Sequence, residues 1–399
     1  MKTEGGSNME NYNLDKQLVI SNRFNYLTYA LMGIGVITII VGLFVNPVKT
    51  WANYLMNNYY FLSLAIGATF FVALQYITQS GWSSAFVRIP QALSNVIPVI
   101  AVLMIPILVF GLPQLYHWAH AGAADHDPII AHKSPYLNLP FFIIRYVVFF
   151  AAWIFLTQYL KKLSLKEDRI GGMANFYKSE LFSKIYIFTL AITFSLATFD
   201  WIMSVDVHWF STIFAVRNFA MSFYHGTVVI TLVIIILNKL GYLPFLNKSH
   251  LKDFAKYIFI LSIIWTYMWF AQYILIWYAN IPEETVYYLP RTKGEFTPLF
   301  YLELFLNFAI PFALLLSNYL VSHKNTLLAI CIVIIFGHWV DLYLQIIVGT
   351  YGKLEIGMIE IGTFLGFAGM FAFIVARALK SAPLVAKNHP YLEESLSHH

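Results

Sequence analysis

The sequence predicts an all-α polytopic membrane protein, from its composition and from the length of its apolar runs. Of the 399 residues, 59% are hydrophobic and only 11% are charged, and the mean hydropathy is +0.67. A soluble globular protein carries about 25% charged residues, with which it covers its surface. Runs of roughly 20 apolar residues, long enough to cross the hydrocarbon core, recur along the chain. The alternating ten-residue segments typical of membrane β-barrels are absent from the sequence.

Ten membrane-spanning helices are expected within a single domain of residues 25–380. The breaks between them contain turn residues or charges, and the tight SVDVHW break separates the fifth span from the sixth. Residues 1–24 and 381–399 are expected to be tails. The expected spans lie near residues 25–46, 53–78, 88–112, 138–160, 182–204, 210–238, 254–280, 296–320, 326–350 and 356–379.

The distribution of lysine and arginine predicts the orientation of the chain. With ten spans, most of the 25 basic residues fall on the side of the two termini. Since basic residues concentrate in cytoplasmic segments, both termini are expected in the cytoplasm. The opposite, outer segments hold only Lys49, Lys133, Arg291, Lys293 and Lys353. The net charge of +5 therefore indicates orientation, and no nucleic acid is expected as a partner.

Two further features limit the classes of function. The N-terminus has mixed charges and no apolar stretch before a small-residue cleavage site, so we expect a retained first helix and no signal peptide. The single cysteine, Cys331, excludes an intrachain disulfide and a cysteine-based metal cluster built by this chain alone.

Ionisable residues inside the spans are the main candidates for function, because each costs several kcal/mol to bury in a membrane. At about 1.5 Å of rise per residue, most of them fall in the outer half of the membrane. Asp200 and Arg217 are expected at similar depth and are predicted to pair, while His225 lies deeper on the face of Arg217. The other residues placed in spans are Arg145, Glu303, His338, Asp341, Gln345 and Glu360.

The segment GHWVDLYLQ in the ninth span is the sharpest local feature. Its residues His338, Asp341 and Gln345 follow i, i+3 and i+4 spacing and share one stripe of a helix. A carboxylate beside a histidine can fix the imidazole tautomer and tune its pKa, which suits the acceptance of a proton from a hydroquinone. The alternative is a polar stripe that only joins helices by hydrogen bonds.

Weaker signals lie in the outer loops. The loop HWAHAGAADHD could bind a metal, although a polar loop that packs against a partner is favoured, and no metal site is predicted. Haem binding by His225 and His338 is disfavoured, because the two are expected at different depths. Glu283 and Glu284, with Asp206, are expected to form an outer proton mouth or a docking patch. The alternative for the two glutamates is a solvated helix end.

Several segments together carry a resemblance to a known family: ATFDWIMSVDVHWFSTIF, WYANIPEET, YLNLPFFIIR and GHWVDLYLQIIVG. They resemble the NrfD/PsrC-like membrane subunits of bacterial alternative complex III, a respiratory quinol:cytochrome c or quinol:oxidase oxidoreductase. The likeness is greatest to the smaller, ten-helix subunit that is described as quinone-binding, and it runs from the first span to the tenth.

The resemblance implies an architecture and a setting. Spans two to five (about 53–204) and six to nine (about 210–350) would form two four-helix bundles, flanked by the first and last spans. The chain would lie in the bacterial cytoplasmic membrane beside a larger NrfD-like quinol-binding subunit. Iron–sulfur and c-type haem subunits would cover the outer face, with a terminal oxidase as a further partner and lipids around the spans.

The resemblance also implies chemistry. The complex would oxidise menaquinol and couple this to proton translocation, with no haem or iron–sulfur cluster in this chain and no catalysis by the chain in isolation. The residues in the matching segments would form a quinone site or a proton path. They are Asp200, His208, Arg217, His225, Glu303, His338 and Asp341.

Two other functions remain open from the sequence. A proton- or ion-coupled secondary transporter would use the same buried charges, but it predicts inverted repeats and interrupted spans, which the sequence does not show. A non-catalytic scaffold subunit would use them only to hold helices together.

Overall fold

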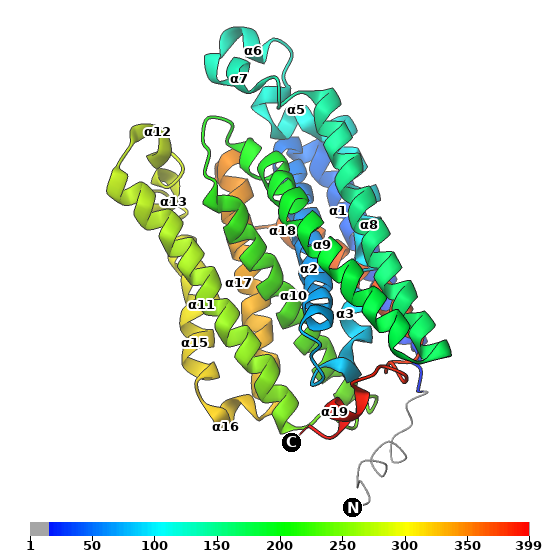
Figure 1. Cartoon of the computed structure of the whole chain (residues 1–399). Helices are drawn as coiled ribbons and strands as arrows, with labels where there is room; N and C mark the ends of the chain where they lie inside the picture. Colours follow the sequence, from blue (N-terminus) through cyan, green and yellow to red (C-terminus); the bar gives the residue numbers. More distant parts are fainter. Residues whose placement is uncertain (1–15, 399) are drawn as a thin grey trace, which may run out of the picture.

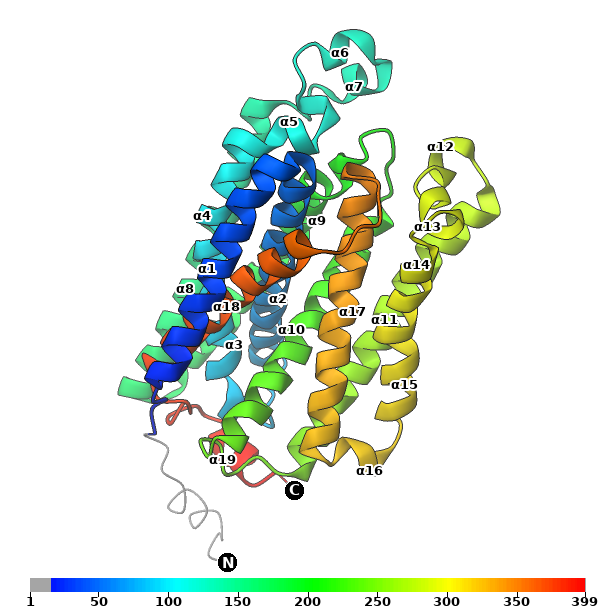
Figure 2. The same cartoon turned by 180° about the vertical axis from the view of Figure 1, so that it is seen from behind.

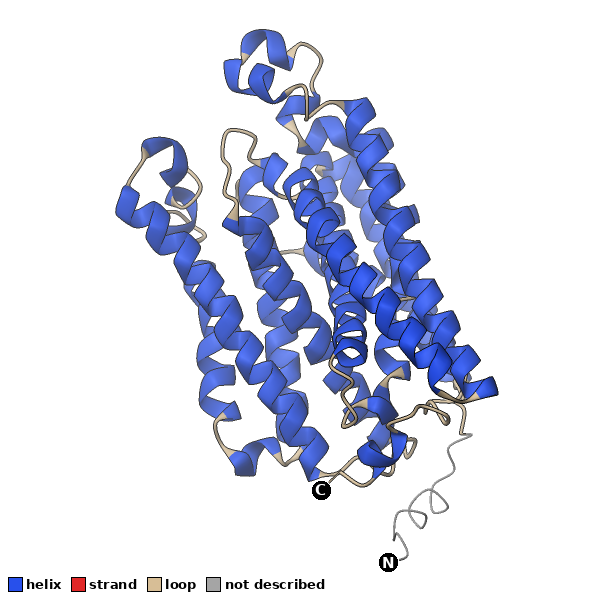
Figure 3. Ribbon diagram, viewed as in Figure 1, coloured by secondary structure: helices blue, strands red, loops and turns tan. Residues whose placement is uncertain are grey.

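The chain folds into an all-α membrane protein, as the sequence predicts. The computed structural model describes residues 16–398, and this part of the chain contains helices and no strands (Figure 3). Ten helices within it are long and apolar enough to cross a membrane. The predicted tail at residues 1–15 lies outside the described residues.

Seven of the spans are single helices. Six of them have bounds within six residues of those expected, whereas α8 continues ten residues beyond the predicted end at residue 160. The second, α2, begins earlier than predicted, directly after the Asn46 cap. The helices are α1 (Asn22–Val45), α2 (Pro47–Ile77), α8 (Leu139–Ile170), α10 (Ile213–Lys239), α11 (Lys248–Ala279), α17 (Lys324–Thr350) and α18 (Met358–Lys380). The fifth span, α9 (Met173–Trp201), ends in a 3-10 turn, η5 (Met203–Val205).

The third and eighth spans are interrupted by π-helical turns beside prolines. The third span comprises η2 (Ser84–Phe86), α3 (Arg88–Leu93), α4 (Val96–Pro106), the π-helix η3 (Ile107–Gly111) and α5 (Leu112–Leu115). The eighth comprises α14 (Thr297–Leu304), the π-helix η6 (Phe305–Ala309) and α15 (Ile310–Leu315). Proline lacks an N–H and cannot make its helical hydrogen bond, so the surrounding turn widens. Both spans keep their helical course through the π-turn.

Short helices occupy the connections at the two ends of the molecule. Figure 1 shows α5–α7 and α12–α13 at one end, here called the loop end, and the start of α1 and the short helix α19 at the other, here called the terminus end. The remaining short elements are η4 (His117–Ala119), α6 (Ala123–His126), α7 (Pro128–Lys133), α12 (Pro282–Thr285), α13 (Leu289–Lys293), α16 (Asn318–Val321) and α19 (Leu392–Leu396).

The spans pack as two neighbouring groups joined by α2 and α10. Helix α2 contacts α4, α9 and α10, and α8 lies along α9; on the other side α10 contacts α11 and α17, and α14 lies along α17 (Figure 1). Figure 2 shows α1 and α18 together on the flank. Their backbones meet at glycines, since a Cβ on Gly35 would lie 2.4 Å from the Cα of Gly366. Small residues of this kind allow the close approach that drives helix association in lipid.

The contact between α2 and α10 is tighter still. A Cβ on Gly67 would lie 1.8 Å from the carbonyl oxygen of Ser222, and one on Gly226 would lie 2.4 Å from the backbone nitrogen of Ala68. The neighbouring atoms belong to the backbone, so neither clash can be relieved by a side-chain rotation. The two groups of helices are thus in direct backbone contact at their centre.

Replacing Gly67 by alanine is therefore expected to lower the free energy of unfolding by at least about 1–3 kcal/mol, the usual cost of overpacking a filled interior. Thermal unfolding of the purified protein in detergent measures this. The matched control is Gly33→Ala on α1, where no atom lies within 4 Å of the added methyl group. Because alanine favours a helix over glycine by about 1 kcal/mol, this control should be neutral or stabilised. Equal melting of the two variants would contradict the packing described here.

The C-terminal residues form an ordered segment that crosses the terminus end. Leu384, Leu392 and Leu396 are buried there. The backbone oxygen of Tyr391 accepts a hydrogen bond from Ser84 Oγ at 2.9 Å, and Ser395 Oγ donates one to the oxygen of Trp82 at 2.7 Å. The predicted tail of residues 381–399 thus covers the start of the third span.

Candidate functional site

The buried charges predicted from the sequence fall into three separate clusters. The first pairs α8 with α9, the second joins α10, α11, α14 and α17, and the third joins α2 with α18. The second, here called the central network, comprises Arg217, Glu303, Asp341 and Gln345. All four side chains are no more than 3% exposed.

The first cluster is a two-point ion pair between Arg145 and Asp200. Arg145 Nε donates to Asp200 Oδ2 at 2.6 Å, and its Nη2 donates to Oδ1 at 3.0 Å. The guanidinium also stacks against Tyr136, 3.9 Å from the ring centre. The predicted pairing of Asp200 with Arg217 is therefore wrong. The planar guanidinium of Arg145, from the neighbouring helix, already fills both carboxylate oxygens.

The central network is built around Arg217 on α10. Its Nη2 donates to Asp341 Oδ1 at 2.6 Å and lies 3.7 Å from Glu303 Oε2, and its Nη1 donates to Gln272 at 3.3 Å. Asp341 Oδ1 also accepts from Gln345 at 2.8 Å. One cation therefore stands between two carboxyl groups. The network carries a net charge of −1 when both carboxyl groups are ionised, and it is neutral when one of them is protonated.

Two tryptophans and an asparagine complete the network. Trp265 Nε1 donates to Asp341 Oδ2 at 3.0 Å, and Trp269 Nε1 donates to Glu303 Oε1 at 2.5 Å. Asn218 donates to Gln345 at 3.0 Å. Indole N–H groups can only donate, so they hold both carboxyl groups in fixed orientations.

His225 and His338 form a buried pair directly below this network. Their rings stack 5.1 Å apart at an interplanar angle of 20°, and both residues are fully buried. The prediction that they lie at different depths is wrong. Each stands twelve residues from the loop end of its helix, Ile213 for α10 and Thr350 for α17, which is about 18 Å of helix in both cases.

Three of the four imidazole nitrogens of this pair have no hydrogen-bond partner within the described residues. His338 Nδ1 lies 2.9 Å from the oxygen of Ile334, whereas His338 Nε2 and both nitrogens of His225 are unpaired. No hydrogen bond joins His338 to Asp341, so the predicted histidine–carboxylate pair is also wrong, because Asp341 is turned toward Arg217. Unpaired polar atoms in a buried site are rare and call for an occupant such as water or a moving proton.

Neighbouring aromatic groups and a π-turn frame the histidines. Tyr60 packs on His225 with ring centres 4.4 Å apart, and Tyr224 packs on His338 at 4.8 Å. The hydroxyl of Tyr224 donates to the backbone oxygen of Asn307 at 3.1 Å, within the π-turn η6. The amide of Asn307 has no partner of its own and abuts Gly337, beside His338. The π-turn thus directs an unused amide group toward the histidine pair.

A further cavity lies at the loop end. It measures about 420 Å³ and is lined by Asp206, His208, Trp209, Tyr287 and Arg291, among others. Arg291 lies 3.7 Å from Asp206 and packs over the Tyr287 ring at 3.5 Å. Burial raises the pKa of Tyr287 and of Tyr288, so both hydroxyl groups stay protonated at neutral pH. Neither hydroxyl has a hydrogen-bond partner.

His208 lies on the surface at this end, away from the membrane interior. Its Nε2 lies 2.5 Å from Asp127 Oδ2, and Asp127 also caps the N-terminus of α7. The hydrogen bond from His208 holds the pKa of Asp127 below its usual range. His208 therefore orders the outer loop and lies outside the buried site.

This pair gives a prediction for pH. Because the folded-state pKa of Asp127 is lowered, its contribution to loop order is present above the ordinary aspartate pKa near 3.9 and is lost as pH falls through the lowered value. Limited proteolysis should therefore cut residues 117–135 faster at acidic pH below about 4. In Asp127→Asn this rise in cutting should be absent. A protease-independent assay, such as hydrogen exchange, guards against the pH dependence of the protease.

The remaining predicted residues lie apart from the network. Glu360 on α18 accepts from Asn53 at 2.9 Å and lies 3.3 Å from Lys49, so it ties the flanking helix to α2. Glu283 and Glu284 stand in the first turn of the short helix α12, where a negative charge suits the helix dipole. Neither glutamate lines the cavity of Asp206.

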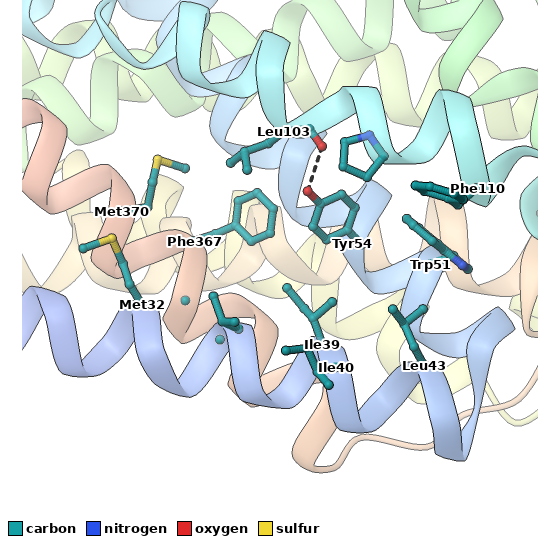
Figure 4. A pocket seen from close by; sticks show the side chains of 14 residues that line it. Met32, Ile39, Ile40, Leu43, Trp51, Tyr54, Leu103, Phe110, Phe367 and Met370 are labelled. Carbon is teal, nitrogen blue, oxygen red and sulfur yellow. Dashed lines mark hydrogen bonds between the residues drawn. The ribbon is translucent and has the colours of Figure 1, made fainter.

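The largest described cavity has a different character. It measures about 690 Å³ and is lined by apolar side chains of α1, α2, α4 and α18, shown in Figure 4. The Tyr54 hydroxyl donates to the oxygen of Leu103 at 2.7 Å, across the turn before Pro106. No carboxyl, histidine, lysine or arginine side chain lines this cavity, and the hydroxyl of Tyr54 is used by Leu103, so the cavity offers space mainly for hydrocarbon.

Sequence reasoning missed several members of the site. Trp265, Trp269, Gln272 and Asn307 are uncharged, and only their spacing on α11 and η6 relative to the charged residues could have indicated them. Among residues 16–398, no group of three or more histidine, cysteine, aspartate or glutamate side chains is arranged to hold a metal ion. No family model matches the chain, and no curated protein is detectably similar to it.

Proposed function

We propose that this chain is a membrane subunit of a bacterial respiratory quinol oxidoreductase of the alternative complex III type, in which it carries protons. The observation that supports this most is the unpaired His225–His338 pair beneath a network of one arginine and two carboxyl groups. The resemblance of its motif segments to the NrfD/PsrC-like subunits supplies the setting. Menaquinol would be the substrate of the complex, and haem and iron–sulfur clusters would belong to partner subunits.

The polar groups follow one another from the loop end to the middle of the membrane. Asp206 and Arg291 stand at the cavity, Tyr287 and Tyr288 follow, then the central network, then the histidines. Histidine is the side chain that gains and loses a proton most readily near neutral pH. Buried ionisable residues in a row within spans are typical of proton relays.

The central network favours proton transfer over quinol binding within this chain. The three large described cavities, of about 690, 590 and 420 Å³, lie on the flank of α1 and α18 and at the loop end, and none of them is lined by His225, His338 or Asp341. Both histidines are fully buried among side chains. The quinol would then be oxidised in the larger neighbouring subunit, and protons would pass through this one.

The test uses the intact complex with His338→Gln and His225→Gln made separately. We expect full subunit content and full haem content, with menaquinol-driven haem reduction slowed by about tenfold or more, since positioned acid–base groups contribute about 10²–10⁴-fold. His323→Gln, at an exposed histidine beside the start of α17 at the terminus end, is the matched control and should leave turnover unchanged.

The alternatives predict different results. A scaffold subunit would give unchanged turnover in all three variants once the complex is assembled. A secondary transporter would purify without haem absorbance and would show ion-dependent uptake in vesicles. Either outcome would overturn the proposal.

A further inference from the structure

A second group of unpaired polar atoms lies in the other set of helices, near the terminus end. Glu167 on α8 is 1% exposed, and neither of its carboxyl oxygens has a hydrogen-bond partner. The hydroxyls of Tyr76, Ser164 and Ser179 are also buried without partners, and those of Ser164 and Ser179 lie close to that of Tyr76. The sequence pattern did not indicate this group.

The charged residues around Glu167 do not neutralise it. Arg88 on α3 is a cation whose charge acts on Glu167, but its Nη1 is used by Gln91 at 2.9 Å and its Nη2 by Asp168 and by the oxygen of Ser164 at 3.2 Å, and its Nε makes no hydrogen bond to Glu167. Lys161, one and a half turns away on α8, donates to Asn95 at 2.9 Å. No described ion pair includes Glu167.

His389, the residue of the C-terminal segment that packs against Tyr76, adds no positive charge either. His389 packs its ring 5.9 Å from that of Tyr76 and 5.6 Å from that of Phe176. Burial lowers the pKa of His389 to about 4, so this imidazole is neutral at physiological pH. Asp168, next to Glu167, adds a negative charge that further disfavours a second carboxylate.

A buried carboxylate without a counter-charge or hydrogen-bond donors costs several kcal/mol, and such a group is neutralised by taking up a proton. We propose that Glu167 is a proton-binding site, held as the neutral acid in a hydrated pocket with Tyr76, Ser164 and Ser179. The site is independent of the central network, which lies on the other side of α2 and α10. It therefore stands or falls separately from the proposed function.

A small cavity at the terminus end adjoins this group at Tyr76. It measures about 10 Å³, the least that holds one water molecule, and is lined by Gln75, Tyr76, Ser83 and His389, among others. The C-terminal segment lies over this region, since His389 lines the cavity and Asn388 donates to the backbone oxygen of Asp168 at 2.9 Å.

The test is infrared difference spectroscopy of the full-length protein at pH 7. Subtracting the spectrum of Glu167→Gln from that of the wild type should reveal the C=O stretching band of one protonated carboxyl group. After transfer to D₂O this band should shift as the proton exchanges. The matched control is Glu180→Gln on α9, because Glu180 is paired with Lys184 at 2.7 Å and is ionised. Its difference spectrum should contain only carboxylate bands.

Two results would overturn the proposal. Loss of carboxylate bands in Glu167→Gln would show that Glu167 is ionised. An acid band that grows as sodium is removed at constant pH would show that a bound cation, and no proton, neutralises the site. If Glu167→Gln does not fold, Glu167→Asp keeps an acid at the site, and its band must then persist at a displaced frequency.

Discussion

Replacing Arg217 by leucine is expected to destabilise the protein more than any other single change in the central network. Within residues 16–398, Arg217 is the only cation paired with Asp341 and Glu303, and all three side chains are no more than 3% exposed. Removing one partner of a buried ion pair costs roughly 3–5 kcal/mol, because the other charge is left without compensation. Here two carboxyl groups lose their counter-charge at once.

The measurement is thermal unfolding together with subunit content of the purified complex. Asp341→Asn is the informative comparison, because it keeps Arg217 beside Glu303 and retains a side chain that accepts from Trp265. It should lose less stability than Arg217→Leu. The double variant Arg217→Leu with Asp341→Asn leaves one uncompensated carboxyl group, Glu303, in place of two, so it should recover part of the loss. Additive losses in the double variant would mean that the two groups do not interact.

Replacing Arg145 by alanine is the second change with a large expected effect. Asp200 is fully buried and receives both of its hydrogen bonds from the Arg145 guanidinium at 2.6 and 3.0 Å. The variant also loses the packing of the guanidinium against Tyr136 and Phe141. A loss of roughly 3–5 kcal/mol in the free energy of unfolding is expected.

Removing both members of the Arg145–Asp200 pair should cost less stability than removing Arg145 alone. Well-packed apolar residues often replace a buried ion pair at little cost, so Arg145→Met combined with Asp200→Leu should be markedly more stable than Arg145→Ala. Chemical unfolding of the three proteins in the same detergent gives the comparison. A double variant as unstable as Arg145→Ala would show that packing around Tyr136 dominates over charge. Under the proposed function, haem reduction by the complex should persist in the double variant, because this pair lies outside the central network.

The sequence predicts the spans well and the contacts between them poorly. Long apolar runs identify all ten spans, since the length of a membrane crossing is fixed by the bilayer. The pairing of Asp200 was wrong because a single sequence does not reveal which helix lies beside α9. The stripe of Asp341 and Gln345 was correctly placed on one face of α17, yet its partners Arg217 and Trp265 come from α10 and α11.

The histidine pair illustrates the effect of small errors in helix ends. The sixth span was predicted to begin at residue 210, three residues before the start of α10 at Ile213. An error of that size moves a residue by about 4.5 Å along the helix. His225 was consequently placed deeper than His338, although the two rings stack. Glu167 was missed for another reason: its neighbours KKLSLKEDR are charged and resemble a solvated connection.

The backbone contact between α2 and α10 has a consequence for how this protein can work. Where glycines bring two helices into contact without intervening side chains, the helices cannot slide or rock past one another without opening an empty gap. Alternating-access transport needs such rocking about a central site. The two groups of helices could make this motion only at a large energetic cost. Under the proposed function, a proton that crosses this region therefore moves by successive transfers between side chains and water while the helices stay in place.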